Sequence, residues 1–141
     1  MNFQRAALAL ALSAGAALMC GAAYAESGKA GTLARHMKAI DTDHDGTIDL
    51  KEARKAASAH LRHLDKDGDN TLDSREMSRL GLDRRAFARA DPDKDNTIDK
   101  REYMALVDRQ FKAADPDHDG TLSSDEVNTQ AGRTLMRLIA R

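Results

Sequence analysis

The sequence of 141 residues lacks most of the features that stabilise small proteins. Its single cysteine, Cys20, excludes a disulfide framework and a cysteine-based zinc site. Aromatic residues make up 4% of the chain and tryptophan is absent, which excludes a large core built from aromatic side chains. An excess of one charge is also missing: 22 Lys and Arg against 23 Asp and Glu give a net charge of -1, without the basic excess of a nucleic-acid-binding domain. Something other than core area must help to stabilise the fold.

The N-terminal segment has almost no charge. Arg5 is the only charged residue before Glu26, and the twenty residues between them are mostly Ala and Leu. This pattern predicts an export signal over residues 1–25, cleaved after Ala25. An uncleaved membrane anchor is the alternative, but Ser and Gly residues dilute the apolar run. The mature chain, residues 26–141, is then expected to be a single domain in the periplasm of a bacterium, without a membrane contact.

Four twelve-residue segments align with one another without a gap. Each has Asp at positions 1, 3 and 5, Thr at position 7, Ile or Leu at position 8, and Glu at position 12. Four of the five Glu residues in the chain occupy position 12, which solvated acidic turns do not explain. We number the segments as loops 1 to 4: DTDHDGTIDLKE (41–52), DKDGDNTLDSRE (65–76), DPDKDNTIDKRE (91–102) and DPDHDGTLSSDE (115–126).

The spacing within each loop is typical of oxygen coordination of a large, hard cation. Side chains at positions 1, 3, 5 and 9, the carbonyl at position 7 and a bidentate Glu at position 12 converge on one point and supply about six or seven oxygens. Four matches in register make a chance occurrence negligible. The predicted metal ligands are Asp41, Asp43, Asp45, Thr47, Asp49, Glu52, Asp65, Asp67, Asp69, Thr71, Asp73, Glu76, Asp91, Asp93, Asp95, Thr97, Asp99, Glu102, Asp115, Asp117, Asp119, Thr121, Ser123 and Glu126.

Two positions distinguish the loops from one another. Position 6 needs a backbone with positive φ, which Gly46 and Gly120 adopt without strain and which Asn70 and Asn96 tolerate better than most residues. Position 9 is Asp in loops 1 to 3 and Ser123 in loop 4, so loop 4 offers four carboxylates where the others offer five. We therefore expect loop 4 to be the weakest site.

The linkers between loops are only 12 to 14 residues long. Apolar residues from Leu50 to Leu64 recur every three or four positions, which predicts one amphipathic helix, and a second helix is predicted from about Lys100 to Ala114. At about 1.5 Å per residue, such a helix separates the loops at its two ends by roughly 20 Å. Loops 1 and 2 therefore cannot pair with each other, and neither can loops 3 and 4.

The middle linker is expected to reverse the chain, because Gly81 is a natural helix C-terminal residue and Asp83 a natural N-cap. Loop 2 should then meet loop 3, and loop 1 should meet loop 4, through the apolar residues at position 8. A helix from about Thr32 to Ile40 is expected before loop 1, and an apolar segment interrupted near Gly132 after loop 4. The predicted fold is all-α, a compact helical bundle with metal loops paired 1 with 4 and 2 with 3 at its two ends.

The arrangement resembles the lanmodulins, periplasmic EF-hand proteins that bind lanthanide ions. The likeness covers the mature chain in its four loops, short linkers, Asp at position 9 and Pro at position 2, and it is closest over 91–126 and over the tail AGRTLMRLIAR. The chain departs from the family pattern in two ways. Only loops 3 and 4 have proline at position 2, namely Pro92 and Pro116, whereas loops 1 and 2 have Thr42 and Lys66, and two loops have Asn at position 6. The resemblance implies binding of up to four lanthanide(III) ions in preference to calcium, with folding on binding.

Charge supports the same interpretation. Five carboxylates around one ion repel one another, and a trivalent ion offsets that repulsion better than a divalent one. The four loops hold 20 acidic and 6 basic residues, a net -14, while the rest of the mature chain holds 15 basic and 3 acidic residues, a net +12. A periplasmic calcium buffer or sensor with the same fold is the main alternative. A second alternative is a regulatory adaptor that binds an unknown protein partner once metal is bound.

Other residues carry weaker signals. No set of nucleophile, base and orienting group is visible and the carboxylates are assigned to metal, so we expect no catalysis. His60 and His63 are three residues apart and could hold a transition metal, but no third ligand is visible and a solvated helix face is the expectation. The methionines are expected to fill a thin core rather than form a partner-binding surface.

Overall fold

The computed structural model describes residues 23–82 and 84–140, which are mostly helical. The predicted export signal, residues 1–25, lies outside the described residues except for its last three, and the predicted N-cap Asp83 also lies outside them. Helices alternate with two-residue strands. In chain order they are α1 (Ala23–Ile40), β1 (Ile48–Asp49), α2 (Leu50–Leu64), β2 (Thr71–Leu72), α3 (Ser74–Ser78), α4 (Arg84–Ala90), β3 (Ile98–Asp99), α5 (Lys100–Ala114), β4 (Thr121–Leu122), α6 (Ser124–Val127) and α7 (Gln130–Ile139).

Residues of the loops themselves begin the two long linker helices. The Asp49 side chain caps α2 by accepting a hydrogen bond from the Glu52 backbone N–H, and the Glu52 side chain accepts one from the Asp49 N–H. Asp99 and Glu102 form the same capping box at the start of α5. This exchange satisfies backbone N–H groups that a helix leaves without intrahelical partners. Both helices have the bounds that the apolar spacing predicts.

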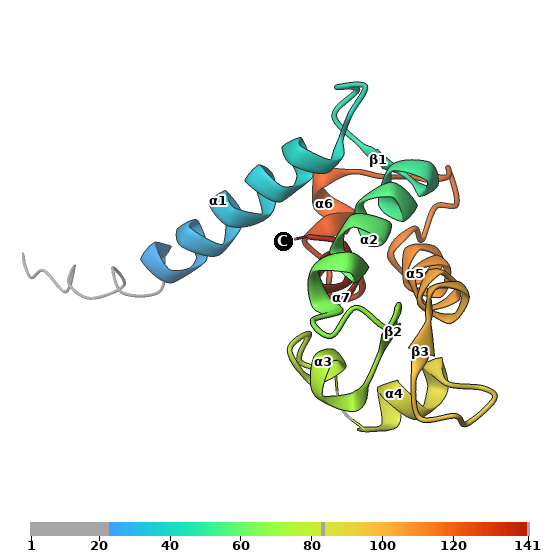
Figure 1. The fold of residues 1–141 in the computed structure, drawn as a ribbon. Coiled ribbons are helices and arrows are strands. Elements are labelled where there is room, and N and C mark those ends of the chain that lie inside the picture. Colours follow the sequence, from blue (N-terminus) through green and yellow to red (C-terminus); the bar gives the residue numbers. More distant parts are fainter. Residues whose placement is uncertain (1–22, 83, 141) are drawn as a thin grey trace, which may run out of the picture.

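The strands join loops that are distant in sequence. β1 is antiparallel to β4, with Ile48 opposite Leu122. β2 is antiparallel to β3, with Leu72 opposite Ile98. All four of these side chains are fully buried. Figure 1 shows the two small sheets at opposite ends of the bundle that α2, α5 and α7 form, so loops 1 and 4 share one end and loops 2 and 3 the other.

Side chains of α2 and α5 hold the C-terminal end of α7. The Tyr103 hydroxyl donates a hydrogen bond to the Leu138 carbonyl at 2.6 Å, and His60 Nδ1 lies 2.9 Å from the same oxygen. Because a carbonyl only accepts, His60 carries its proton on Nδ1. The expectation of a solvated face is therefore wrong for His60, which is 6% exposed beneath α7, although His63 is exposed. Burial raises the pKa of the Tyr103 hydroxyl well above its usual value.

Gly132 has a different role from the predicted one. The break after loop 4 falls at Asn128 and Thr129, and Thr129 caps α7 by accepting a hydrogen bond from the Gly132 N–H at 3.0 Å. Gly132 lies inside α7, where an added Cβ would stand 2.2 Å from the Glu126 carbonyl oxygen and 2.6 Å from Val127 Cα. The glycine therefore permits α7 to pack on the backbone of α6 rather than ending a helix.

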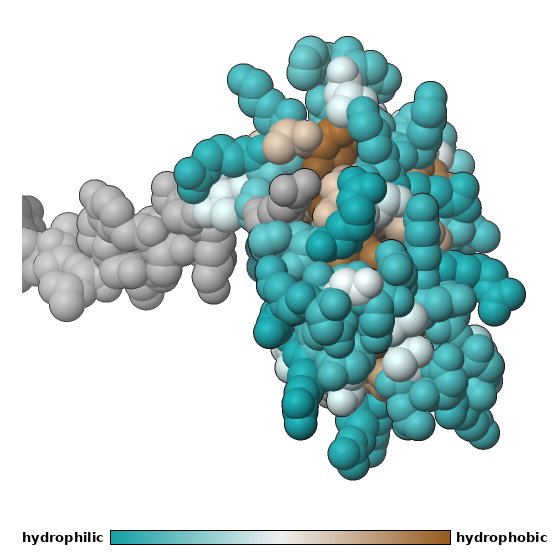
Figure 2. Space-filling model, viewed as in Figure 1, coloured by the Kyte–Doolittle hydropathy of each residue, from teal (hydrophilic) through white to brown (hydrophobic). Residues whose placement is uncertain are grey.

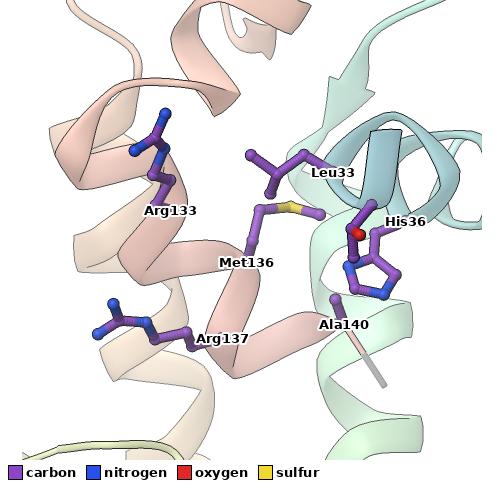
Figure 3. A pocket seen from close by; sticks show the side chains of 7 residues that line it. Leu33, His36, Arg133, Met136, Arg137 and Ala140 are labelled. Carbon is purple, nitrogen blue, oxygen red and sulfur yellow. The ribbon is translucent and has the colours of Figure 1, made fainter. Parts of the chain in front are cut away.

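The first helix is longer than expected. α1 begins at Ala23 instead of about Thr32, and so continues across the predicted cleavage position. The segment before Thr32 has no proline, and its two glycines, Gly28 and Gly31, weaken a helix without excluding one. Between α1 and α7 lies a pocket of about 510 Å³, in which Met136 points toward Leu33 (Figure 3). Two arginines from α7, Arg133 and Arg137, line it, which makes it unsuitable as a cation site.

Polar side chains cover most of the face in Figure 2, and apolar side chains are visible mainly in gaps between them. The core contains Met37, Met77 and Met136, each at most 8% exposed, which confirms that these methionines fill the core. Among residues 23–82 and 84–140, no helix is long and apolar enough to span a membrane.

Candidate metal centres

The same backbone turn closes all four loops. The N–H at position 6 donates to Oδ2 of the Asp at position 1. The donor–acceptor distance is 3.0 Å for Gly46, 3.1 Å for Asn70 and Asn96, and 3.2 Å for Gly120. Each of these residues has positive φ, between 68° for Asn96 and 89° for Gly46. The two asparagines therefore adopt the conformation that glycine adopts in the other loops, as their position predicts.

Position 4 has a conformation that we did not predict. His44, Lys94 and His118 have φ of 63°, 61° and 59°, in the left-handed region that most side chains avoid. Gly68, with φ of 79°, occupies the same position in loop 2 and was the only residue in the sequence that could have indicated it. Because loop closure determines the conformation here, the three larger residues adopt it against their own preference.

The recurring Thr at position 7 orients the Asp at position 5. In loop 1, the backbone N–H and the hydroxyl of Thr47 both donate to Asp45 Oδ1, at 2.8 and 2.7 Å. The other three loops repeat both hydrogen bonds. These bonds lower the pKa of Asp45 and that of Asp95, because they stabilise the ionised carboxylate. The sequence assigned Thr47 only a backbone carbonyl ligand, so its side-chain role was missed.

The Asp at position 3 lies in a more repulsive environment. In Asp43, Asp67 and Asp117, a hydrogen bond from the backbone N–H two residues later lowers the pKa. Desolvation and the negative charges of the neighbouring carboxylates outweigh that bond, and the net shift of the pKa is upward. Burial likewise raises the pKa of Glu102. The folded loops thus disfavour the ionised form of several predicted ligands, and a bound cation would reverse this effect.

Each loop brings three carboxylates together. In each group, one ligand oxygen per residue lies within 4.8 Å of the others. The groups are Asp41, Asp43 and Asp45 in loop 1; Asp65, Asp67 and Glu76 in loop 2; Asp91, Asp93 and Glu102 in loop 3; and Asp115, Asp117 and Glu126 in loop 4. Oxygen-rich, anionic clusters of this kind suit calcium-sized hard cations of charge two or three.

The predicted ligands at position 9 serve as helix N-caps. Asp49 and Asp99 each accept a hydrogen bond from the backbone N–H of the position-12 Glu in their own loop, at 2.7 Å. Asp73 accepts the corresponding bond from the Glu76 N–H at 2.8 Å. Ser123 differs because its hydroxyl donates to Glu126 Oε2 at 2.8 Å. The substitution of Ser for Asp therefore removes a carboxylate and adds a hydrogen-bond donor to the Glu of loop 4.

The loops match a known family. The family model for the EF hand matches residues 35–55, 82–107 and 106–129, which include loops 1, 3 and 4. The matched segments leave out loop 2, although its hydrogen bonds repeat those of the other loops. A search of curated proteins finds no match to the chain. The matched loops, together with their acidic clusters, identify the chain as an EF-hand protein with loops suited to binding metal ions.

Proposed function

We propose that this chain binds lanthanide(III) ions, up to four, in its four loops, and that calcium is its weaker ligand. The observation that carries the proposal is the convergence of carboxylates in every loop, with three ligand oxygens within 4.8 Å of one another. Loops 1 to 3 each add two further carboxylates, including the one at position 9. Because the trivalent ions are similar in size to calcium, the charge of the site helps to decide between them, and a fivefold anionic site favours the higher charge.

We further propose that metal binding and folding are coupled. The loops carry a net charge of -14, and their carboxylates raise one another's pKa in the folded state. The apolar core that opposes this repulsion includes four alanines among its fully or nearly fully buried members, and it contains no tryptophan. Where binding sites exist only in the folded chain, the free energy of binding adds to that of folding.

The proposed setting is the periplasm, where the protein would take up, store or deliver rare-earth ions. The uncharged segment between Arg5 and Glu26 supports export, and the resemblance to lanmodulins supports the role. We propose binding rather than catalysis, because the carboxylates that could act as acids or bases are those assigned to metal. Cell fractionation with an antibody against the mature chain tests the location, and recovery in the cytoplasm at full length would contradict it.

One titration separates the lanthanide proposal from its main alternative. Purified protein freed of metal with chelator is titrated with La³⁺ in a large excess of Ca²⁺, and with Ca²⁺ alone, while far-ultraviolet circular dichroism reports helicity. We expect La³⁺ to raise helicity at stoichiometric concentration in the presence of Ca²⁺. Comparable affinities for the two ions would favour a calcium buffer or sensor. Full helicity in chelator, unchanged by La³⁺, would contradict coupled folding.

Matched variants connect the response to the loops. Replacing the position-1 Asp by Asn in all four loops removes one charge from each cluster and should abolish the response to La³⁺. The control replaces Asp108, an acidic residue of α5 outside the loops, by Asn and should bind as the unmodified protein does. The adaptor alternative predicts a protein partner that is captured only with metal, which a pull-down with and without La³⁺ detects.

A further inference from the structure

The residue at position 2 of each loop determines whether Oε1 of the Glu at position 12 receives a hydrogen bond. In loop 2, the Lys66 N–H donates to Glu76 Oε1 at 2.8 Å. In loop 1, both the N–H and the hydroxyl of Thr42 donate to Glu52 Oε1, at 2.5 and 3.0 Å. These two loops therefore neutralise part of the charge of their bidentate ligand with their own donors.

Loops 3 and 4 have proline at position 2, and proline has no N–H to donate. Glu102 Oε1 and Glu126 Oε1 are buried and have no hydrogen-bond partner. A second oxygen in loop 3, Asp91 Oδ1, is also buried without a partner, as is Asp115 Oδ1 in loop 4. Their counterparts in loops 1 and 2 accept the backbone N–H of His44 and Gly68, both at 2.6 Å.

Loop 3 therefore contains an unsatisfied anionic site. Glu102 is 5% exposed and Asp91 is 6% exposed, so solvent does not replace the missing donors. Their ligand oxygens lie with that of Asp93 within 4.8 Å of one another. Leaving buried carboxylate oxygens without partners is unfavourable, and a bound cation is the group that relieves it.

Loops 2 and 3 form a matched pair in which this difference can be isolated. They have identical residues at positions 1, 3, 5, 6, 7, 9, 11 and 12, including all of the predicted ligands. They also share one sheet, through Leu72 opposite Ile98. They differ at position 2, where one has Lys66 and the other Pro92, and at positions 4, 8 and 10, which supply no predicted ligand.

We propose that loop 3 binds a metal ion before loop 2 does, and that the Lys66 N–H lowers the metal affinity of loop 2. This inference rests on the proposed metal-binding function and concerns the order in which the sites fill. The ion in loop 3 gains two carboxylate oxygens that have no competing donor. The ion in loop 2 must instead share Glu76 Oε1 with a hydrogen bond to a charged acceptor, a difference that corresponds to roughly tenfold or more in the dissociation constant.

A residue-resolved titration tests the order. The amides of Asn70 and Asn96 each donate to the position-1 carboxylate of their own loop at 3.1 Å, so each reports on its own site. With ¹⁵N-labelled protein and substoichiometric La³⁺, we expect the metal-bound signal of Asn96 to appear before that of Asn70. If neither amide responds to La³⁺, the proposed function fails. If both respond together, or Asn70 responds first, binding stands and the proposed order is wrong.

Variants at position 2 test the cause. Lys66→Pro removes the donor from loop 2, where Asp65 already has the extended backbone that a following proline requires, with ψ of 100°. Because the Gly68 N–H still donates to Asp65 Oδ1 in this variant, we expect the response of Asn70 to move toward that of Asn96 without reaching it. Lys66→Ala removes the same charge, keeps the N–H and should leave the order unchanged. The reverse change, Pro92→Ala, restores a donor and should delay loop 3 by a comparable factor.

Loop 1 separates hydrogen bonding from the stiffness of proline. Thr42→Val removes only the hydroxyl bond to Glu52 Oε1 and introduces no ring. Followed through the Gly46 amide, this variant should bind La³⁺ several-fold more tightly than the unmodified loop. The proposal is overturned if Thr42→Val has no effect on loop 1, or if Lys66→Ala moves the response of Asn70 toward that of Asn96 as Lys66→Pro does.

Discussion

The contact between α6 and α7 predicts a large effect from a single methyl group. In Gly132→Ala, the new Cβ would stand 2.2 Å from the Glu126 carbonyl oxygen, about 1.2 Å short of ordinary van der Waals contact at 3.4 Å. The atoms that it meets belong to the backbone, so no side-chain rotation can relieve the overlap. α7 must move away from α6, and its four large apolar side chains, Leu135, Met136, Leu138 and Ile139, lose part of their packing.

We expect this substitution to destabilise the metal-loaded protein by about 3 kcal/mol, at the upper end of the range for overpacked sites. For a domain of about 100 residues, that loss lowers Tm by roughly 15 °C. Thermal unfolding in excess La³⁺, followed by circular dichroism, measures the change. Because the displaced carbonyl belongs to Glu126, the Gly120 amide should also show weaker La³⁺ binding in loop 4, while Asn96 in loop 3 should be unaffected.

Gly31→Ala provides the matched control. Gly31 lies in α1, and an added Cβ there meets nothing within 4 Å. Replacing glycine by alanine at an open helical position stabilises by about 0.5 to 1 kcal/mol, so this variant should unfold at the same temperature as the unmodified protein or slightly above it. If Gly132→Ala also unfolds at the temperature of the unmodified protein, the close approach of α7 to the α6 backbone does not exclude a Cβ at residue 132, and our reasoning fails.

Three further predictions concern the bundle and its loops. Tyr103→Phe removes the hydroxyl that donates to the Leu138 carbonyl at 2.6 Å and should lower the free energy of unfolding by about 1 kcal/mol in urea denaturation, since His60 still bonds to that oxygen. Arg54→Ala breaks the exposed ion pair with Asp108 between α2 and α5 and should lower it by less than about 1 kcal/mol, so a larger loss would contradict the assignment of stability to the core. Without metal, Tm should rise as pH falls from neutral toward 4.5, the ordinary pKa of Glu. Burial raises the pKa of Glu102, so the folded state binds its proton more readily than the unfolded state does, and the destabilisation present above that raised pKa is lost as pH falls through it. The position-3 aspartates have pKa shifts of the same sign, and the lowered pKa values of Asp45 and Asp95 act in the opposite direction. Loaded with La³⁺, the protein should instead lose Tm over the same range because protons compete with the ion, and equal pH profiles with and without metal would contradict the repulsion argument.

Local rules of the sequence were sufficient for the long helices. The apolar spacing from Leu50 to Leu64 predicted the bounds of α2, because one buried stripe and two short polar loops leave few alternatives. The same rules predicted positive φ at Asn70 and Asn96, since closure of a twelve-residue loop depends on residues within the loop. They failed for His60, because what buries that ring is α7, a helix about seventy residues away along the chain.

The candidate sites divide in the same way. The identity, spacing and charge of the carboxylates were readable from the sequence, because every one of them belongs to a continuous twelve-residue segment. Which carboxylate oxygens are satisfied was not readable. It depends on the distance from a backbone N–H to a particular oxygen, such as the 2.8 Å between Lys66 N and Glu76 Oε1, and on the burial that keeps water from Glu102.

The sequence by itself predicted the four loops, their candidate ligands and the helices between them, because these features arise from contacts within a few turns of the chain. Only the tertiary structure decided that Gly132 serves close packing, that the Leu138 carbonyl receives hydrogen bonds from two other helices, and that loops with equal carboxylates differ in free acceptor oxygens. These properties depend on atoms that folding brings together from distant segments or places within a few tenths of an ångström, and a one-dimensional pattern does not specify such distances.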